Sequence, residues 1–396
     1  SNVASNVQPF LSEISLGKAA IAHNGNLINV NPLREQLVKD GAIFASTSDT
    51  EIILHLLARA PQRGPQGSVI TEALIDALSK VKGAFSLVLL FQDRLVAVRD
   101  PHGVRPLSIA KMNGAFIVAS ETCAFDLIGA EFVRDVEPGE LVEFFNEKDG
   151  KVQQRSLSPF GMARPAPCVF EYVYFARPDS NIFGRNVYLV RKRLGQELAK
   201  EHPVKADIVV PVPDSGVTAA IGYSEASGIP LELGLIRNHY IGRTFIEPKQ
   251  AIRDFGVKIK HNANPAILKG KSVVVVDDSI VRGTTSQKLV KMLRQAGARE
   301  LHMRISSPPT IDPCFYGIDT PKKDELIAPK MSIEKIKEFL GVDSLAYLSR
   351  DGMYRAVAVS GEEPSALQQR FCDACFSGHY PIGTPADHKR KQQEIL

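Results

Sequence analysis

The chain has 396 residues, 44% of them hydrophobic and 23% charged, which is the composition of a soluble protein large enough for two folded domains and a tail. The net charge of +4 is too small to indicate nucleic acid as a partner and is compatible with an anionic substrate. No apolar run approaches the roughly 20 residues of a membrane span, and no basic-then-apolar secretory signal opens the chain. These features exclude a membrane partner and predict a cytoplasmic location, or an organelle after loss of a transit peptide.

The first 160 residues alternate between apolar and polar positions and predict a domain rich in β strands. Residues 18–22 lead into the pair Asn24 and Gly25, which predicts a tight turn between two strands. Residues 47–51 precede a periodic apolar run, so Asp49 or a neighbouring hydroxyl is expected to cap a helix. Further strands are predicted at residues 85–91, 95–98 and 115–120, with a turn at residues 100–103.

Prolines and arginines gather between residues 155 and 167, and this stretch is the predicted domain boundary. Beyond it we predict a helix near residues 188–200, a strand at residues 208–212 and a second helix from about residue 217. The tight loop before that second helix contains Asp214 and Ser215. Either residue could serve only as a helix cap, but the strand-loop-helix order, which recurs around Asp277, favours a second substrate loop.

The stretch from residue 235 to residue 261 is rich in basic side chains and has few acids. Such a run of basic residues usually forms a solvated surface. Alternatively, the segment binds an anion. The basic residues in it are Arg237, His239, Arg243, Lys249, Arg253, Lys258 and Lys260.

Residues 272–285 read SVVVVDDSIVRGTT and hold the most informative motif of the chain. The four consecutive valines predict a parallel strand buried on both faces. Ligands gather at the carboxyl end of such strands, and here Asp277 and Asp278 follow at once. Gly283 permits close backbone approach, and a helix predicted over residues 286–296 offers its N-terminus to an anion. The motif therefore predicts a ligand with vicinal hydroxyls and a phosphate, in preference to an ordinary strand-to-helix turn.

This motif resembles that of the type I phosphoribosyltransferases, which bind 5-phosphoribosyl-1-diphosphate, and it lacks the Gly-Lys-Ser/Thr ending of a P-loop. The resemblance implies magnesium at Ser215, Asp277 and Asp278, since this cation prefers oxygen ligands and substrate phosphates. It also implies that Tyr240 and Arg243 belong to a flap that closes over the diphosphate. The implied substrate contacts are Asp214, Ser215, Asp277, Asp278, Ser279, Arg282, Gly283, Thr284 and Thr285.

Four segments of the first domain, AHNGNL, STSDTE, RDPHGVRPL and ASETCAFD, resemble the glutamine amidotransferase domain that uses an N-terminal cysteine nucleophile. The resemblance implies that Asn24 and Gly25 form an oxyanion hole and that Asp49 binds the α-amino group of glutamine. The sequence opens with Ser1 and contains no counterpart of the family's first cysteine or of its His-x-Arg-Tyr motif. We therefore expect an incomplete first domain without glutaminase activity.

Five cysteines are too few for a disulfide scaffold in a chain of this length. Cys372 and Cys375 form a C-x-x-C motif, while Cys168 and Cys314 lie far away in the sequence. Four thiolates suit zinc or a [4Fe-4S] cluster, and spacing does not choose between them. A resemblance to the cluster-containing branch of the amidotransferases implies [4Fe-4S]. Cys123 is left over and is expected to be a buried apolar residue.

Over essentially the whole chain the resemblance is to the glutamine phosphoribosylpyrophosphate amidotransferases of purine synthesis. It implies an α+β glutaminase-type domain at residues 1–160, an α/β phosphoribosyltransferase domain at residues 161–350 and a tail at residues 351–396 with two cluster ligands. The implied reaction converts phosphoribosyl diphosphate and glutamine or ammonia to phosphoribosylamine, with purine nucleotides as feedback inhibitors and a homo-oligomer, dimer or tetramer, as the assembly.

Two other functions use the same phosphate-binding motif. A salvage phosphoribosyltransferase would transfer the sugar to a purine base, but it would not need the first domain or four matched cysteines. A non-catalytic regulator that senses phosphoribosyl diphosphate would typically add a helix-turn-helix, and the sequence contains no such segment.

Overall fold

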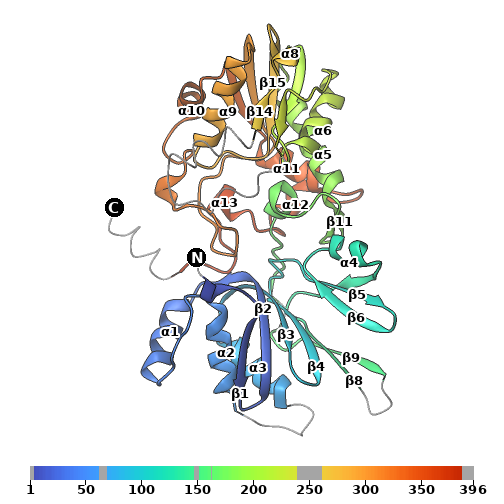
Figure 1. Ribbon diagram of the computed structural model, residues 1–396, viewed down its shortest axis with the longest axis vertical. Helices are drawn as coiled ribbons and strands as arrows, with labels where there is room; N and C mark the ends of the chain where they lie inside the picture. Colours follow the sequence, from blue (N-terminus) through green and yellow to red (C-terminus); the bar gives the residue numbers. More distant parts are fainter. Residues whose placement is uncertain (1–3, 62–68, 147–150, 162, 239–260, 386–396) are drawn as a thin grey trace.

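The structure, a computed structural model, describes residues 4–61, 69–146, 151–161, 163–238 and 261–385. A first domain made mostly of β strands lies at the bottom of Figure 1 and an α/β domain lies at the top. None of the helices in these ranges has both the length and the apolar character needed to cross a bilayer.

The first domain is built on a six-stranded antiparallel sheet in the order β1-β2-β3-β4-β8-β9. A second sheet, in the order β6-β5-β7, covers part of one face. Its elements are η1 (Ala4–Asn6), β1 (Phe10–Ile14), β2 (Gly17–Leu27), α1 (Val30–Lys39), α2 (Thr50–Ala58), α3 (Val69–Ser79), β3 (Gly83–Leu90), β4 (Arg94–Arg99), β5 (Ser108–Met112), β6 (Ala115–Ala119), α4 (Cys123–Ile128), β7 (Glu131–Asp135), β8 (Leu141–Asn146) and β9 (Val152–Leu157).

Alternation along β4 explains why this domain has layers on both sides of its sheet. Val96 and Val98 pack into the core shared with α2 and α3. Ala97, between them, packs into a separate core. This core includes Ile109 of β5 and Leu107, the residue just before β5. Because successive side chains of a strand point to opposite faces, an apolar strand of this kind requires cover on both faces.

The turn predicted at Asn24 and Gly25 is wrong, because β2 continues through both residues and pairs with β3 as far as Leu27. Gly25 has φ of +149°, and a Cβ on it would lie 2.1 Å from the carbonyl oxygen of Ala84 on β3. Glycine is therefore required here for the close approach of the neighbouring strand, and an Asn-Gly pair signals a turn only where no such partner exists.

The second domain has a four-stranded parallel sheet in the order β12-β15-β16-β17. All six residues of β15 are buried, which confirms the predicted buried valine strand. Val274 and Val276 face α5 and α6, whereas Val273 and Val275 face α9 and α10. The elements are α5 (Val187–Glu201), β12 (Ile208–Pro211), α6 (Val217–Ser227), β13 (Leu235–Arg237), β14 (His261–Ala263), α8 (Pro265–Leu268), β15 (Ser272–Asp277), α9 (Thr284–Gln295), β16 (Glu300–Ile305), α10 (Ile333–Leu340) and β17 (Ser344–Tyr347).

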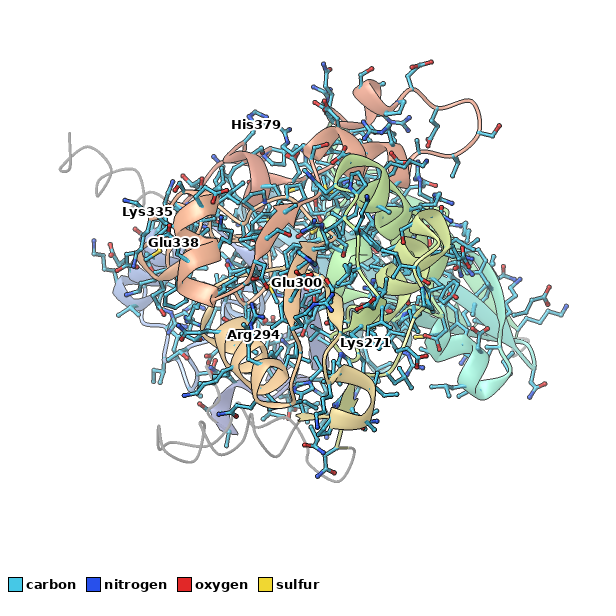
Figure 2. All side chains as sticks on the ribbon, turned by 90° about the horizontal axis from the view of Figure 1, so that it is seen from above. Lys271, Arg294, Glu300, Lys335, Glu338 and His379 are labelled. Atoms are coloured by element: carbon cyan, nitrogen blue, oxygen red, sulfur yellow. The ribbon has the colours of Figure 1, made fainter. Side chains whose placement is uncertain are left out.

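Most sequence predictions for these elements are confirmed, with shifts of one or two residues at their ends. The helix predicted over residues 286–296 begins two residues earlier, at Thr284, directly after the left-handed Gly283. Figure 2 looks onto the outer end of this domain and shows charged side chains such as Lys271 and Glu338 on its outside.

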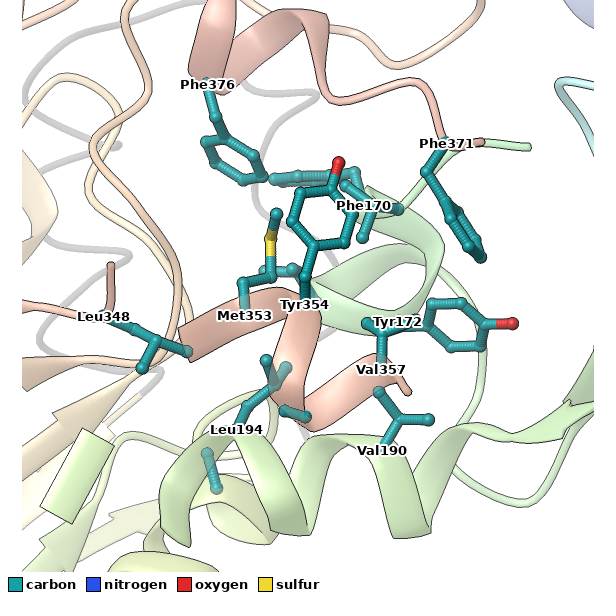
Figure 3. Packing of buried hydrophobic residues seen from close by; sticks show 14 of the residues in the cluster. Phe170, Tyr172, Val190, Leu194, Leu348, Met353, Tyr354, Val357, Phe371 and Phe376 are labelled. Atoms are coloured by element: carbon teal, nitrogen blue, oxygen red, sulfur yellow. The ribbon is translucent and has the colours of Figure 1, made fainter. Parts of the chain in front are cut away.

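The two domains share a continuous apolar core near the middle of the molecule. In Figure 3, Phe170 lies near Phe376, Tyr172 near Phe371, and α5 contributes Val190 and Leu194 below them. The elements that meet here are a π-helical turn η2 (Glu171–Phe175), β10 (Asn181–Ile182), β11 (Arg185–Asn186), α11 (Arg350–Val357), α12 (Pro364–Leu367) and α13 (Ala374–Ser377), whereas the short η4 (Lys323–Glu325) lies outside this core. The C-terminal segment is thus packed against the body of the protein over its described residues.

Candidate functional site

Two adjacent carboxyl groups stand at the carboxyl end of β15. Asp277 and Asp278 are 8% and 5% exposed. Burial raises the pKa of Asp277 well above its ordinary value, and the charge of Asp278 adds to the effect. Burial also raises the pKa of Asp278, while hydrogen bonds from Ser215 and Ser279 and the charge of Arg191 oppose the rise. In the described part of the chain no basic side chain forms a salt bridge with either carboxylate.

The loop after β12 lies against this pair. The Val212 N–H donates to the carbonyl of Val276 at 2.9 Å, and Gly216 approaches the same carbonyl so closely that a Cβ would lie 2.4 Å from it. This contact places Ser215 near Asp278, and the serine opposes the rise in the pKa of that carboxyl. Asp214 is turned toward Arg237 of β13 and forms an ion pair with it. The two predicted substrate loops therefore meet at one edge of the sheet.

The remaining motif residues form the turn into α9. Gly283 occupies the left-handed region at φ +77°, and no side chain caps the helix that follows. Thr284 and Thr285 are exposed in its first turn, where backbone N–H groups lack intrahelical partners. Arg282 lies at the surface and pairs with Glu325 at 2.7 Å, so it does not point at the acidic pair. The turn can accept a phosphate through N–H and hydroxyl donors.

These residues fit a magnesium ion that is shared with substrate phosphates. Two buried carboxylates near a serine hydroxyl supply oxygen ligands, and a cation would offset the burial and the neighbouring charge that raise the pKa of Asp277. The same carboxylates could instead bind the hydroxyls of a ribose. Tyr240 and Arg243, predicted for the flap, lie outside the described residues.

A second group of polar residues surrounds the end of β2 in the first domain. Asp49 does not cap α2 with its side chain, although it stands at the capping position. Its carboxylate accepts a hydrogen bond from the Leu27 N–H at 2.8 Å and lies 3.6 Å from the ring of His23. The pKa of Asp49 lies below its ordinary value because these partners outweigh the opposing effect of burial. Asp49 is therefore held ionised beside the strand that carries Asn24.

The amide of Asn24 is held at both its oxygen and its nitrogen. Arg105 Nε donates to Asn24 Oδ1 at 3.2 Å, and Asn24 Nδ2 donates to the hydroxyl of Ser120 at the same distance. Arg105 is 0% exposed, and its guanidinium lies 2.8 Å from Glu171 and over the ring of Phe175. With its oxygen held by Arg105 and one N–H held by Ser120, the amide has one further N–H that could donate to an anion.

Four cysteines line one apolar cavity, whose walls come from the second domain and the C-terminal segment. Cys168 and Cys372 are joined by an isolated parallel β-bridge, and Cys314 and Cys375 complete the wall. Burial raises the pKa of Cys168 to about 12, and it raises the pKa of Cys372 and Cys375 as well. Cys123 is buried elsewhere, as expected. The cavity is also lined by Phe170, Val281, Thr310, Phe315, Tyr316, Ile318, Thr320, Ala374 and Tyr380.

The four cysteines line one cavity but are not gathered around a single ion. Thiolates around one zinc ion at 2.3 Å lie roughly 3.8 Å apart, and no three His, Cys, Asp or Glu side chains of the described residues are placed to hold one ion. One backbone N–H nevertheless points at a sulfur, because Tyr316 N donates to Cys314 Sγ at 3.3 Å. Such donors stabilise thiolates bound to a cluster.

Three contributors to these sites were not predicted. Arg105 and Arg191 are buried arginines, and Glu171 is a buried acid three residues after Cys168. Arg191 donates to the carbonyls of Tyr172 and Ala176 and adds positive charge near Asp278. Only Glu171 carried a signal in the sequence, because it stands alone in the apolar stretch CVFEYVYFA and glutamate is rarely buried without a specific partner.

Comparison with known proteins agrees with this division of sites. Residues 1–126 match the glutamine amidotransferase domain, and residues 184–306 match the phosphoribosyl transferase domain. Amidophosphoribosyltransferase of Rhizobium etli is 52% identical over 95% of this chain and 75% of its own length. Amidophosphoribosyltransferase 1, chloroplastic, of Arabidopsis thaliana is 50% identical over 98% of this chain and 65% of its own length.

Among solved structures, glutamine phosphoribosylpyrophosphate amidotransferase from B. subtilis, complexed with ADP and GMP, superimposes with a TM-score of 0.87. It is 46% identical, and the match covers 98% of this chain and 82% of that one. The sequence identity is near one half over nearly all residues, and both domains occur in the same order, so the family of this chain can be assigned. The chain belongs to the amidophosphoribosyltransferase family.

Proposed function

We propose that this protein transfers nitrogen from ammonia, or from glutamine, to C1 of 5-phosphoribosyl-1-diphosphate, giving 5-phosphoribosylamine and pyrophosphate in purine synthesis. The observation that supports it most is the meeting of the Ser215 loop with the Asp277 and Asp278 pair at the carboxyl edge of a parallel sheet. Ligands of such sheets bind at this edge, and the family assignment supplies the substrate.

The ribose hydroxyls are assigned to Asp277 and Asp278, and the 5-phosphate to the turn of Ser279, Gly283, Thr284 and Thr285. Asp214 and Ser215 face the diphosphate. Bound magnesium, held by Ser215, Asp277 and Asp278 with the phosphates, supplies positive charge against the leaving group. We assign Tyr240 and Arg243 to the closing flap and Arg282 to the rim of the phosphate site.

The reaction is a displacement at C1. The nitrogen lone pair forms the new C1–N bond while the C1–O bond to the diphosphate breaks, and the product nitrogen then loses a proton. Catalysis comes from holding ammonia near C1 and from stabilising the departing charge, and no covalent intermediate with the protein is required.

The first domain is proposed to bind glutamine, with Asp49 on the α-amino group and with Asn24 and Gly25 as oxyanion donors. No cysteine of the described residues lies at this site, because four line the cavity and Cys123 is buried beyond Ser120. We therefore propose that residues 1–396 use ammonia and do not hydrolyse glutamine.

The domain limits 1–160, 161–350 and 351–396 and the homo-oligomeric state remain predictions.

We also propose that Cys168, Cys314, Cys372 and Cys375 hold a [4Fe-4S] cluster, which would tie residues 372–375 to the body of the protein.

Purine nucleotides are proposed as inhibitors, since the B. subtilis relative was solved with ADP and GMP.

A direct test uses 15N-ammonium, phosphoribosyl diphosphate and magnesium. The proposal expects one 15N atom in the phosphoribosyl product for each pyrophosphate released, as measured by mass spectrometry. Pyrophosphate released without nitrogen in the product would show hydrolysis and contradict it.

A further inference from the structure

Two elements that supply cavity cysteines also contact the oxyanion end of β2. The first is the loop of residues 314–317. Asn26 Nδ2 donates to the carbonyl of Phe315 at 3.0 Å, next to the thiol of Cys314. Gly317 lies against Gly25 so tightly that a Cβ on Gly317 would lie 2.8 Å from Gly25 Cα. Two glycines in contact leave no side chain between the loop and the strand.

The second element is the segment that follows Cys168. The Glu171 N–H donates to the carbonyl of Cys168 at 3.3 Å, so the thiol and the carboxylate share one turn of backbone. Glu171 forms its ion pair with Arg105, and Arg105 Nε donates to Asn24. Glu171 and Arg105 are 1% and 0% exposed, so neither can exchange its partner for water.

Each element therefore reaches from a cavity thiol to an oxyanion donor within a few residues. Gly317 fixes the backbone at Gly25, and Arg105 fixes the side-chain amide of Asn24. Packed interiors transmit small displacements of this kind because they have few voids to absorb them.

We propose that filling of the four-cysteine cavity fixes Asn24 and Gly25 in place, with Gly317 and Arg105 as positioning residues. This rests on the proposed cluster and on the proposed oxyanion role. An empty cavity leaves four buried thiols without a shared partner, and the two elements are then free to move apart. The first domain thus acquires its full oxyanion geometry only after the second domain has received its cluster.

Hydrogen exchange of the chain tests the coupling without measuring activity. Protein reconstituted anaerobically with iron and sulfide is compared with protein emptied by a chelator, and peptides covering residues 20–27 are followed by mass spectrometry. We expect exchange at the end of β2 to become at least about fivefold faster on emptying, the ratio expected when one net hydrogen bond is lost. Peptides from β8 and β9, at the far edge of the same sheet, should be unchanged, and a uniform change across the sheet would contradict a local coupling.

Two variants test the connecting residues independently of the cluster. Gly317→Ala and Glu171→Gln should exchange fast at residues 20–27 even when iron is bound. Gly114→Ala is the matched control for the glycine, because Gly114 has a similar positive φ of +83° but no atom within 4 Å of its Cβ position. If the chain takes up no iron, the proposed cluster is wrong. The coupling is still tested, because hydrogen exchange at residues 20–27 can be compared between each variant and the unmodified chain. Equal exchange in both variants and in the control overturns the inference.

Discussion

The Val212 N–H donates a hydrogen bond to the carbonyl of Val276 at 2.9 Å, and this bond joins the start of the loop after β12 to the end of β15. The two strands are neighbours in the parallel sheet, with Val210 opposite Val275. One loop would bind the diphosphate and the other the ribose, so their junction is where C1 and its leaving group should lie.

Asp278→Asn should lower the rate of ammonia-dependent phosphoribosylamine formation by at least about 10²-fold, since it removes a charge that contacts sugar or magnesium. The fold should persist, because the amide has nearly the same shape as the carboxylate. Steady-state pyrophosphate release and circular dichroism measure the two effects. Asp343→Asn, at a partly exposed acid just before β17, is the control, and near-normal turnover in the Asp278 variant would remove Asp278 from the site.

Asp49→Asn should weaken glutamine binding by about 10-fold or more, because a hydrogen bond to a charged group contributes about 1.5–3 kcal/mol. Since the folded pKa of Asp49 is lowered, its carboxylate stays ionised down to acid pH, and affinity should be flat from pH 8 to pH 5. Calorimetric titration with glutamine measures both. Asp40→Asn, just after α1, should bind as the unmodified chain does, and a fall in affinity already between pH 7 and pH 5 would argue against Asp49.

Anaerobically purified protein should be brown and contain about four iron atoms per chain, as a [4Fe-4S] cluster requires. Cys314→Ser should lower the iron content and shift the visible spectrum, because one cavity ligand is lost. Cys123→Ser changes a buried cysteine outside the cavity and should retain the full iron content. A colourless preparation with one zinc per chain would contradict the cluster.

The buried strand and its two acids could be predicted because the relevant information is local. A strand covered on both faces needs consecutive apolar residues, and Val273 to Val276 supply them within one short segment. The order of strand, acids, glycine and helix then predicts that a ligand binds at the carboxyl edge of the sheet, without knowledge of the rest of the fold. For the same reason the predicted ends of α5, β12 and α9 lie within two residues of the observed ends.

The role of Gly25 could not be predicted in this way, because it depends on Ala84 of another strand and on Gly317 of the other domain. Taken with their sequence neighbours alone, Asn24 and Gly25 predict a turn. Arg105 was part of a recognised motif, but its partner Glu171 lies across the domain boundary. The convergence of the four cysteines is also long-range, and only the resemblance to a family brought them together.

Gly195→Ala should destabilise the protein by about 1–3 kcal/mol, although alanine favours helices. The reason is that α5 crosses α6 in direct backbone contact, and a Cβ on Gly195 would lie 1.8 Å from the carbonyl oxygen of Ala219. Chemical denaturation measures the change. Lys200→Ala, at an exposed position of the same helix, should change the free energy of unfolding far less. Equal changes in the two variants would show that α5 and α6 accommodate the added methyl group by moving apart.

Glutamate release from glutamine should be undetectable with residues 1–396, because oxyanion donors without a neighbouring thiolate form no acyl-enzyme. A coupled glutamate dehydrogenase assay measures it. Release at a rate comparable with the phosphoribosyl reaction would show that another group acts as nucleophile.

The central claim, that this chain transfers nitrogen to phosphoribosyl diphosphate, is tested most directly by measuring pyrophosphate release with different acceptors. Protein, magnesium and phosphoribosyl diphosphate are supplied with ammonium, with adenine, with hypoxanthine or with no acceptor. The account predicts release that rises with ammonium and stays at the no-acceptor level with either base. Release that depends on a purine base would identify a salvage enzyme, and binding of phosphoribosyl diphosphate without release in any mixture would identify a sensor; either result contradicts the account.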